Sequence, residues 1–261
     1  MDHKLIQRAA HDILHSKKTI AFTGAGISVE SGIPAFRGSQ GLWEKYDPEE
    51  YAHIVSFRSD PDRVWLMLKE MFSLIIDAKP NPGHTGLAEL ERMGLLSSII
   101  TQNVDGLHQR AGSAGVLDYH GNVSLLRCSS CGARYDPEGF DLERMLREDR
   151  LPPMCEACNG VLKSDIVHFH EAIPIDVAEQ SQEEAERCDC MLICGTSAVV
   201  YPFANLPRIA KQRYRAKGTL IIEINAEPTP LTAEGISDYI IQGKTGTILP
   251  KLLEEVKLRL H

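Results

Sequence analysis

The chain has 261 residues, of which 43% are hydrophobic and 25% are charged, and its formal net charge is −8. These values are typical of a globular protein with one large core or two unequal domains, and they argue against a non-specific nucleic-acid binder, which needs a basic surface. An acidic surface instead suits basic partners such as lysine-bearing protein segments. No run approaches the roughly 18 apolar residues of a membrane helix, and the N-terminus lacks a signal-peptide core, so we expect a cytoplasmic protein without membrane contact.

Short apolar runs alternate with helical patterns along the chain. An amphipathic helix is predicted over residues 2–16 and an apolar strand, TIAF, over 19–22. Further strands are predicted at 97–101, 191–194, 219–225 and 238–243. Further helices are predicted at 60–77, 83–94, 175–187, 203–216 and 246–260. Continuous rather than alternating apolar strands indicate a parallel sheet with helices on both faces, so the predicted fold class is α/β with a doubly wound sheet.

Two segments interrupt this alternation, at about 39–80 and 123–165. The first is helical and apolar, with large side chains at helical spacing, and the second holds four spaced cysteines. We expect the two insertions to join as a smaller lobe beside one larger domain, so that residues 1–261 form a single unit. The larger domain would then comprise residues of about 1–38, 81–122 and 166–261.

The glycine-rich stretch TGAGIS, residues 23–28, follows the first predicted strand. Backbone N–H groups of such a turn can approach a pyrophosphate, and the N-terminus of the next helix adds a favourable dipole. Gly24 and Gly26 fit the first two glycines of a dinucleotide-binding pattern, but Val29 stands where the third small residue is expected. An ordinary tight turn is therefore an alternative on these residues alone.

Polar residues follow later strands at the edge where ligands of open α/β sheets collect. Gln102, Asn103 and Asp105 follow the strand at 97–101, and an amide with a carboxylate can orient a carboxamide and sugar hydroxyls. An Asx-capped turn explains them equally well. Two later strand ends contribute Gly195, Thr196, Ser197 and Asn225. These groups can bond phosphate or ribose, with helix capping as the alternative for Ser197.

His120 lies between Tyr119 and Gly121, whose missing side chain would leave one face of the imidazole open. A histidine of near-neutral pKa can remove a hydroxyl proton if it reaches one. For His84, His108 and His168 we favour structural roles, as caps, packed rings or surface groups.

Four of the seven cysteines form two C-x-x-C pairs, Cys128 with Cys131 and Cys155 with Cys158, at the spacing of a zinc ribbon. Four sulfur ligands fill the tetrahedral shell of Zn²⁺ and leave no position for water, so the predicted site is structural. A redox dithiol is the alternative, although such a pair is normally single and opens a helix. The remaining cysteines, Cys188, Cys190 and Cys194, are expected to be buried without function.

Taken together, GAGIS, IPAFRG, TQNVDGLH, YHGN, the paired C-x-x-C set, GTSAVVYP and EIN resemble, in this order, the motifs of the sirtuins, the NAD-dependent protein lysine deacylases. The resemblance spans nearly the whole chain. It implies a Rossmann-type large domain and a small lobe made of a helical insertion and a zinc ribbon. It also implies NAD as cofactor, one structural zinc ion per chain, and acyl-lysine proteins or peptides as substrates.

The resemblance assigns roles to the matching positions. The pyrophosphate loop would contain Gly24, Ala25 and Gly26, and a mobile cofactor loop would contain Phe36 and Arg37. Gln102 and Asn103 would address the nicotinamide ribose and Asp105 the carboxamide. Phosphate, adenosine ribose and adenine would be held by Gly195, Thr196, Ser197, Asn225, Gly243 and Lys244. His120 resembles the general base, with Asn103 as a second catalytic residue.

The acylated peptide would pair as a strand between VHFHE and the loop AVVYP, a mode that depends little on peptide sequence. The contacts implied are Val167, Phe169, Glu171, Val199, Val200 and Tyr201. By the implied chemistry, the amide oxygen attacks the ribose carbon bearing nicotinamide, nicotinamide leaves, and an alkylamidate forms. The general base then removes a proton from a ribose hydroxyl, so that the sugar attacks the imidate carbon. Water completes the reaction, which releases free lysine and O-acyl-ADP-ribose.

Two departures from the family pattern concern the substrate. His170 replaces the glycine that is usual in the peptide-binding strand. The tyrosine and arginine of the desuccinylase branch are replaced by Leu68 and Met71, so a neutral acyl group is expected. The alternatives are an NAD-dependent ADP-ribosyltransferase, against which His120 argues, and a silent NAD-binding or zinc-ribbon module, against which the complete motif set argues.

Overall fold

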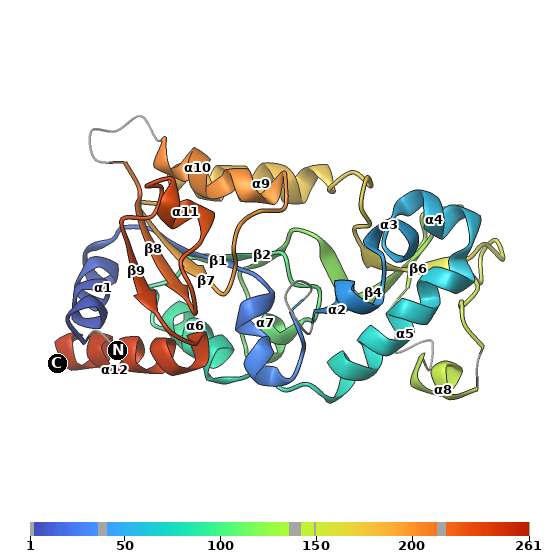
Figure 1. Ribbon diagram of the computed structural model, residues 1–261, viewed down its shortest axis with the longest axis horizontal. Helices are drawn as coiled ribbons and strands as arrows, with labels where there is room; N and C mark the ends of the chain where they lie inside the picture. The colour runs from blue at the N-terminus through green and yellow to red at the C-terminus, as the bar shows by residue number, and fades with distance from the viewer. Residues whose placement is uncertain (1–2, 36–40, 136–141, 149, 213–217, 261) are drawn as a thin grey trace.

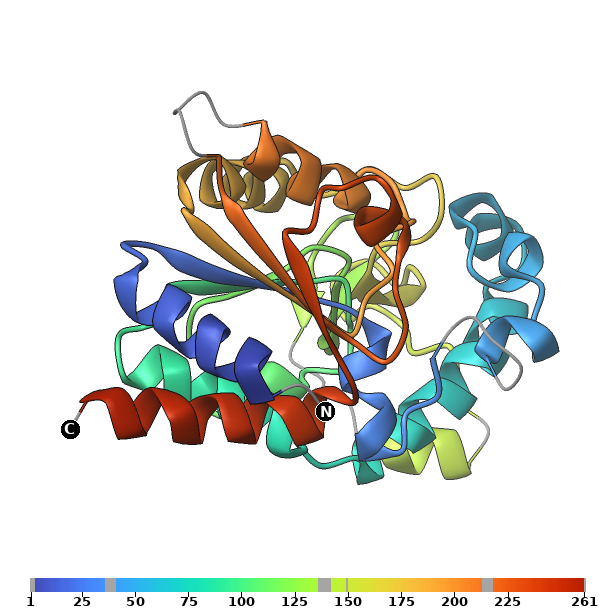
Figure 2. The ribbon, with the colours of Figure 1, turned by 60° about the vertical axis from the view of Figure 1, so that its left-hand side comes forward.

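The computed structural model describes residues 3–35, 41–135, 142–148, 150–212 and 218–260 (Figure 1). Its larger part is a six-stranded sheet flanked by two layers of helices, and a smaller helical and β-ribbon part lies beside it (Figures 1 and 2). Within the described residues, no helix combines the length and the apolar character needed to cross a membrane.

The large sheet is parallel throughout and has the order β3-β2-β1-β7-β8-β9. Its strands are β1 (Thr19–Thr23), β2 (Ser98–Thr101), β3 (Val116–Asp118), β7 (Cys190–Cys194), β8 (Leu220–Asn225) and β9 (Tyr239–Gln242). Numbered within this sheet, the order is 3-2-1-4-5-6, which is the Rossmann arrangement with its switch point between β1 and β7. The predicted α/β fold class is therefore confirmed.

Helices cover both faces of this sheet, which explains why its strands are apolar without alternation. One face packs against α1 (His3–His15), α6 (Pro82–Arg92) and α12 (Thr245–Leu260), as Figure 2 shows. The other face packs against α9 (Ile175–Arg187), α10 (Leu206–Lys211) and α11 (Pro230–Ala233). Along β1, Ile20 and Phe22 enter the second core while Ala21 enters the first.

The two predicted insertions share one hydrophobic core. The first contains α2 (Leu42–Lys45), α3 (Pro48–Tyr51), α4 (Ile54–Ser59) and α5 (Pro61–Asp77). The second contains β4 (Gly121–Cys128), β5 (Arg134–Tyr135), α8 (Leu142–Arg147) and β6 (Leu162–Ile166), with an antiparallel β5-β4-β6 sheet. Trp65 of α5 is buried and donates from Nε1 to the carbonyl of Leu162, 3.1 Å away. We infer that this cluster is the core of the smaller lobe.

Several elements differ from the sequence prediction. The edge strand β3 has only three half-buried residues, too few to give a periodic signal. The helices α2, α3 and α7 (Leu107–Arg110) have four residues each, too few to give a periodic signal. The helix predicted over 203–216 begins as a 3₁₀ turn at Phe203–Asn205, and α10 ends at Lys211. Residues 213–217 lie outside the described part of the chain.

Candidate functional site

A cavity of about 710 Å³ opens where the carboxyl ends of β1, β7 and β8 meet the smaller lobe. Most of the predicted cofactor and peptide residues line it. They are Ala25, Gly26, Gln102, Asn103, His120, Val167, Phe169, Glu171, Gly195, Thr196, Ser197, Val200, Tyr201, Asn225, Gly243 and Lys244. Asp105 lines a smaller adjoining cavity with Ala25 and Asn103. Phe36 and Arg37 lie outside the described residues.

The glycine turns after β1 and β7 pack backbone against backbone. The amide of Gly26 donates to the carbonyl of Gly195 at 2.8 Å, and Gly195 has a φ of +63°. A Cβ atom on Gly24 would lie 2.2 Å from Nε2 of Gln102, and one on Gly195 would lie 2.3 Å from the amide nitrogen of Ile27. The glycines are therefore required by the packing of the two loops as well as by the open cradle.

The helix expected after TGAGIS is replaced by two 3₁₀ turns, Ala25–Ile27 and Val29–Ser31. Each turn has only three residues, so neither carries the dipole of a full helix. The amide-lined turn rather than a helix N-terminus is therefore the main feature that this stretch offers to an anion.

Asn103, Asp105 and Ser28 form a buried hydrogen-bonded group behind the cavity. The Asn103 amide donates to the carbonyl of Gly24 and to Oγ of Ser28, both at 3.1 Å. Ser28 in turn donates to Asp105 at 2.7 Å, and burial raises the pKa of this carboxyl group. Oδ1 of Asn103 is buried without a hydrogen-bond partner among the described residues. An unsatisfied buried acceptor beside a cavity is an expected partner for a ligand donor.

The role of Ser28 in this group was missed in the sequence analysis. Its side chain is 1% exposed although it lies in a glycine-rich turn. The only sequence signal was a hydroxyl residue inside TGAGIS, and such residues are common in turns. Its contact with Asp105 joins residues 77 positions apart, which local sequence cannot reveal.

His120 faces the cavity with its ring fixed by its neighbours. Nδ1 lies 3.3 Å from the carbonyl oxygen of Gln102. Because a carbonyl only accepts hydrogen bonds, Nδ1 carries the hydrogen in this arrangement and Nε2 is left as the acceptor. The ring packs beside Tyr119 and Phe203. Burial lowers the pKa of His120 to about 4, so the imidazole is neutral at pH 7.

Gly121 was expected to leave one face of the His120 ring open, but the structure shows a different need for glycine at this position. Its φ is +77°, and a Cβ atom there would lie 1.9 Å from the carbonyl oxygen of Asp165. Glycine is therefore needed for the close pairing of β4 with β6, which fixes the backbone at the base candidate.

The segment after β6 is held by its own chain on one edge. The amide of Val167 donates to the carbonyl of His120 at 2.8 Å, and the amide of Phe169 donates to the carbonyl of Ala52 at 2.8 Å. Across the cavity, Val200 and Tyr201 belong to the opposite loop, where Val199 and Tyr201 are exposed. Exposed apolar side chains at a cavity rim suit contact with a peptide.

Glu171 has its carboxylate occupied within the protein. It accepts from Nζ of Lys163 at 2.7 Å and from Arg127 at 2.9 Å. Burial opposes ionisation of Glu171, but hydrogen bonds from His168 and Lys163 prevail and lower its pKa to about 2. Its side chain therefore braces β4 and β6 against the peptide segment, in addition to any contact with substrate.

The histidines expected to be structural are buried. His84, His108 and His168 are at most 3% exposed, and burial lowers the pKa of each. Cys188, Cys190 and Cys194 are also buried, as expected. For Cys194, burial raises the pKa of the thiol to about 12, which leaves it unreactive.

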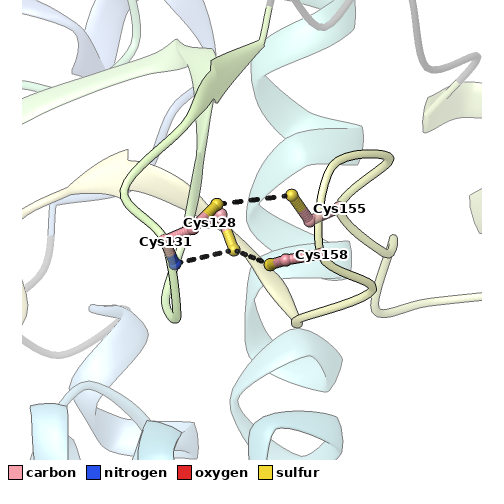
Figure 3. Close-up of side chains that lie close together, drawn as sticks. All are labelled: Cys128, Cys131, Cys155 and Cys158. Carbon is pink, nitrogen blue, oxygen red and sulfur yellow. Dashed lines mark hydrogen bonds between the residues drawn. The ribbon is translucent and has the colours of Figure 1, made fainter.

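Four thiols converge from two loops of the smaller lobe (Figure 3). Cys128 and Cys158 have sulfurs 3.5 Å apart, and those of Cys131 and Cys155 are 3.7 Å apart. All four cysteines are free, and their sulfurs lie within 4.8 Å of one another. A tetrahedral zinc site with Zn–S bonds of about 2.3 Å requires S–S separations of about 3.8 Å. The cluster therefore fits a four-sulfur metal site.

Hydrogen bonds within the ribbon favour the thiolate form of two of the four cysteines. The amides of Ser130 and Cys131 both donate to Sγ of Cys128 at 3.4 Å. The Tyr135 hydroxyl lies 3.0 Å from Sγ of Cys155, and this hydrogen bond lowers the pKa of that thiol to about 6. Because metal ligands must be deprotonated, these bonds favour metal binding.

Comparison with known proteins identifies one family. The family model described as the Sir2 family matches residues 24–202. The chain is 47% identical over 246 residues to NAD-dependent protein deacylase 2 of Pyrobaculum aerophilum, with 94% of each chain covered. It is similar to a solved Sir2 homologue in complex with NAD (TM-score 0.87, 42% identity, 100% and 96% of the chains covered). It is also similar to a solved Sir2 protein bound to a myristoylated histone peptide (TM-score 0.80, 39% identity, 99% of each chain covered).

Proposed function

Because this chain belongs to the Sir2 family and is an NAD-dependent protein deacylase, we propose that His120 is its general base and that acyl-lysine peptides bind across the large cavity. The observation that carries this proposal is the neutral His120 ring at the cavity wall, with Nδ1 bonded to a backbone carbonyl and Nε2 left as an acceptor.

The residues around the cavity fit NAD. At the switch point, Gly24 lies so close to Thr196 that a Cβ atom on Gly24 would lie 2.6 Å from Cβ of Thr196. Glycine at position 24 therefore leaves room beside Thr196. Oδ1 of Asn103 is a buried acceptor that still lacks a partner among the described residues. Asn225 ends β8 and lines the same cavity. When bound, NAD supplies a ribose carbon with nicotinamide as its leaving group.

The proton-transfer step follows from the position of His120. Nε2 would accept the proton of a ribose hydroxyl, and the imidazolium so formed would keep its Nδ1–H bond to Gln102. The hydrogen bond holds the ring in the required tautomer throughout. Asn103, fixed through Gly24 and Ser28, would orient the ribose.

We also propose that the four-cysteine cluster holds one structural zinc ion. The donor set and the sulfur separations support this assignment. Four thiolates would complete the zinc shell, so the ion would stabilise the ribbon and take no part in acyl transfer.

For cellular setting, we propose a reducing cytoplasmic compartment and basic protein segments as partners, without direct binding to nucleic acid or membranes. Four cysteines arranged as a possible metal site support a reducing compartment. The net charge of −8 supports lysine-bearing partners and opposes binding to phosphate backbones.

We expect the acyl group to enter a part of the cavity lined by apolar side chains. Met67 and Met71 line the cavity from α5, and Val104 and Ile166 also line it. Leu68 is fully buried in the core of the smaller lobe. Among the described lining residues, the only lysine or arginine is Lys244, which follows β9 at the predicted nucleotide end. A carboxylate carried by the acyl chain would therefore be buried without a cationic partner.

We expect acetyl- and butyryl-lysine to be hydrolysed at least about 100-fold better than succinyl-lysine, because an unpaired buried carboxylate costs several kcal/mol. The measurement is kcat/KM for the three acyl groups on one peptide backbone, with and without NAD. As a matched control, Met71→Arg should narrow the difference by providing a partner. Succinyl-lysine turnover equal to or above that of acetyl-lysine would refute the neutral-acyl assignment.

A further inference from the structure

Two histidines and a glutamate from separate segments converge beside the cavity, and none of them has a role in the deacylation described above. They are Glu49 of α3, His53 at the N-cap of α4, and His170 after β6. One ligand atom of each lies within 4.8 Å of the others. The two imidazole rings stack with centroids 4.6 Å apart. Glu49 and His170 are exposed and His53 is half-buried, so the cluster is open to solvent ions.

Backbone pairing brings the two histidines together. The amide of Phe169 donates to the carbonyl of Ala52 at 2.8 Å, and the amide of Ile54 donates to the carbonyl of Phe169 at 3.1 Å. These bonds make a short parallel bridge between His53 and Phe169. These hydrogen bonds fix the backbone at both histidines, so that their side chains lie close together.

His170 occupies a backbone conformation that favours glycine. Its φ is +60°, which is uncommon for residues with a side chain and carries a strain cost. Its side chain is turned onto His53. In addition, the carboxylate of Glu49 has no ion-pair partner among the residues that the structure describes. A strained histidine stacked on a second histidine beside an unpaired carboxylate suggests a ligand set.

We propose that Glu49, His53 and His170 bind a divalent transition-metal ion of the zinc class. Two imidazoles and one carboxylate are a ligand set that Zn²⁺ uses in proteins, whereas Mg²⁺ and Ca²⁺ favour all-oxygen sites. The bound ion ties the α3–α4 segment of the smaller lobe to the segment that follows β6. Three protein ligands leave a coordination position for water, in contrast to the four-cysteine cluster.

Two features set the expected affinity. Metal–ligand bonds of about 2.0–2.2 Å require donor atoms about 3.4 Å apart, so the exposed side chains must rotate slightly to close the shell. The amide of Val55 donates to Nδ1 of His53 at 3.0 Å, and an ion at Nδ1 displaces this helix cap. We therefore expect a dissociation constant of about 1–100 µM, weaker than that of the cysteine cluster.

The test is calorimetric titration of Zn²⁺ into protein whose cysteine cluster is already loaded. His11 and His15 stack on α1 with centroids 4.0 Å apart and offer a competing pair, so the titration uses a His11→Gln/His15→Gln background. We expect one further equivalent of Zn²⁺ and no heat with Mg²⁺. Glu49→Gln, His53→Gln and His170→Gly should each weaken Zn²⁺ binding at least tenfold.

The His170→Gly variant keeps the test decisive, because glycine adopts a φ of +60° without strain and the variant should fold at least as well as the parent. Thermal unfolding of both proteins with the cysteine cluster loaded and no further Zn²⁺ added checks this directly. Added Zn²⁺ should raise the unfolding temperature of the His11→Gln/His15→Gln background protein and leave that of the same protein carrying His170→Gly unchanged. The proposal is overturned if no further equivalent binds, or if His170→Gly binds Zn²⁺ with unchanged affinity.

Discussion

Replacing His120 by alanine should lower the rate of deacylation by about 10²–10⁴-fold, because a positioned general base contributes that much to a proton transfer. The ring lies at the cavity wall and is neutral at pH 7, so the variant loses the acceptor atom Nε2. NAD binding should change little, since the glycine turns and Asn103 are untouched. Steady-state kcat with an acetyl-lysine peptide measures the first effect, and calorimetric NAD binding measures the second.

A matched control separates this chemical effect from a change in packing. His15→Ala removes an exposed imidazole at the end of α1, just before β1 begins, whereas the cavity lies beyond the carboxyl end of this strand, so kcat should be unchanged. Phe203→Leu keeps an apolar contact beside His120 and should cost much less than removal of the base. Near wild-type turnover of the His120→Ala protein would show that another group accepts the proton.

Removal of the metal from the cysteine cluster should unfold the smaller lobe. Apparent binding energies of structural zinc are about 10–16 kcal/mol, which is comparable to the whole stability of a typical domain. Cys128 and Cys155 belong to the same hydrophobic core as Trp65. Loss of the metal would remove the bonds that hold the four cysteines together and would therefore disturb this core. Cys128→Ser or Cys155→Ser should therefore lose zinc and the near-ultraviolet signal of the tryptophans.

Elemental analysis of protein purified without chelators should find one tightly bound zinc ion per chain. Cys194→Ala is the matched control, because this buried thiol lies in the core of the large sheet and should not alter the zinc content. Absence of zinc from the parent protein, or its loss from the Cys194→Ala variant, would count against the assignment of the cluster.

The sequence predicted the long elements well because their periodicity is strong. The five predicted strands and the helices α1, α5, α6, α9 and α12 agree with the structure to within one or two residues at most ends. The strand β3 was not predicted because three edge residues carry no pattern. The individual strands β4, β5 and β6 were not predicted either, because their segment was recognised only by its spaced cysteines. The single-turn helix α3 has only four residues, so it gives no periodic signal even though Asp47 caps it.

The site was predictable in its residue types but less so in its internal bonds. The polar strand ends placed Gln102, Asn103 and Asn225 at the crevice, and all three line the cavity. The bond from Ser28 to Asp105 and the network around Glu171 join distant positions, so periodicity and spacing could not reveal them. The tautomer of His120 likewise depends on the carbonyl of Gln102, a bond that only the folded chain provides.

Mass spectrometry of the products formed from NAD and an acetyl-lysine peptide tests the deacylase mechanism most directly. Acyl transfer to ADP-ribose predicts equal amounts of nicotinamide, free-lysine peptide and O-acetyl-ADP-ribose, and the His120→Ala protein should form far less of the last two. A peptide that gains ADP-ribose and keeps its acetyl group, or NAD cleavage without loss of acetyl, would contradict the mechanism.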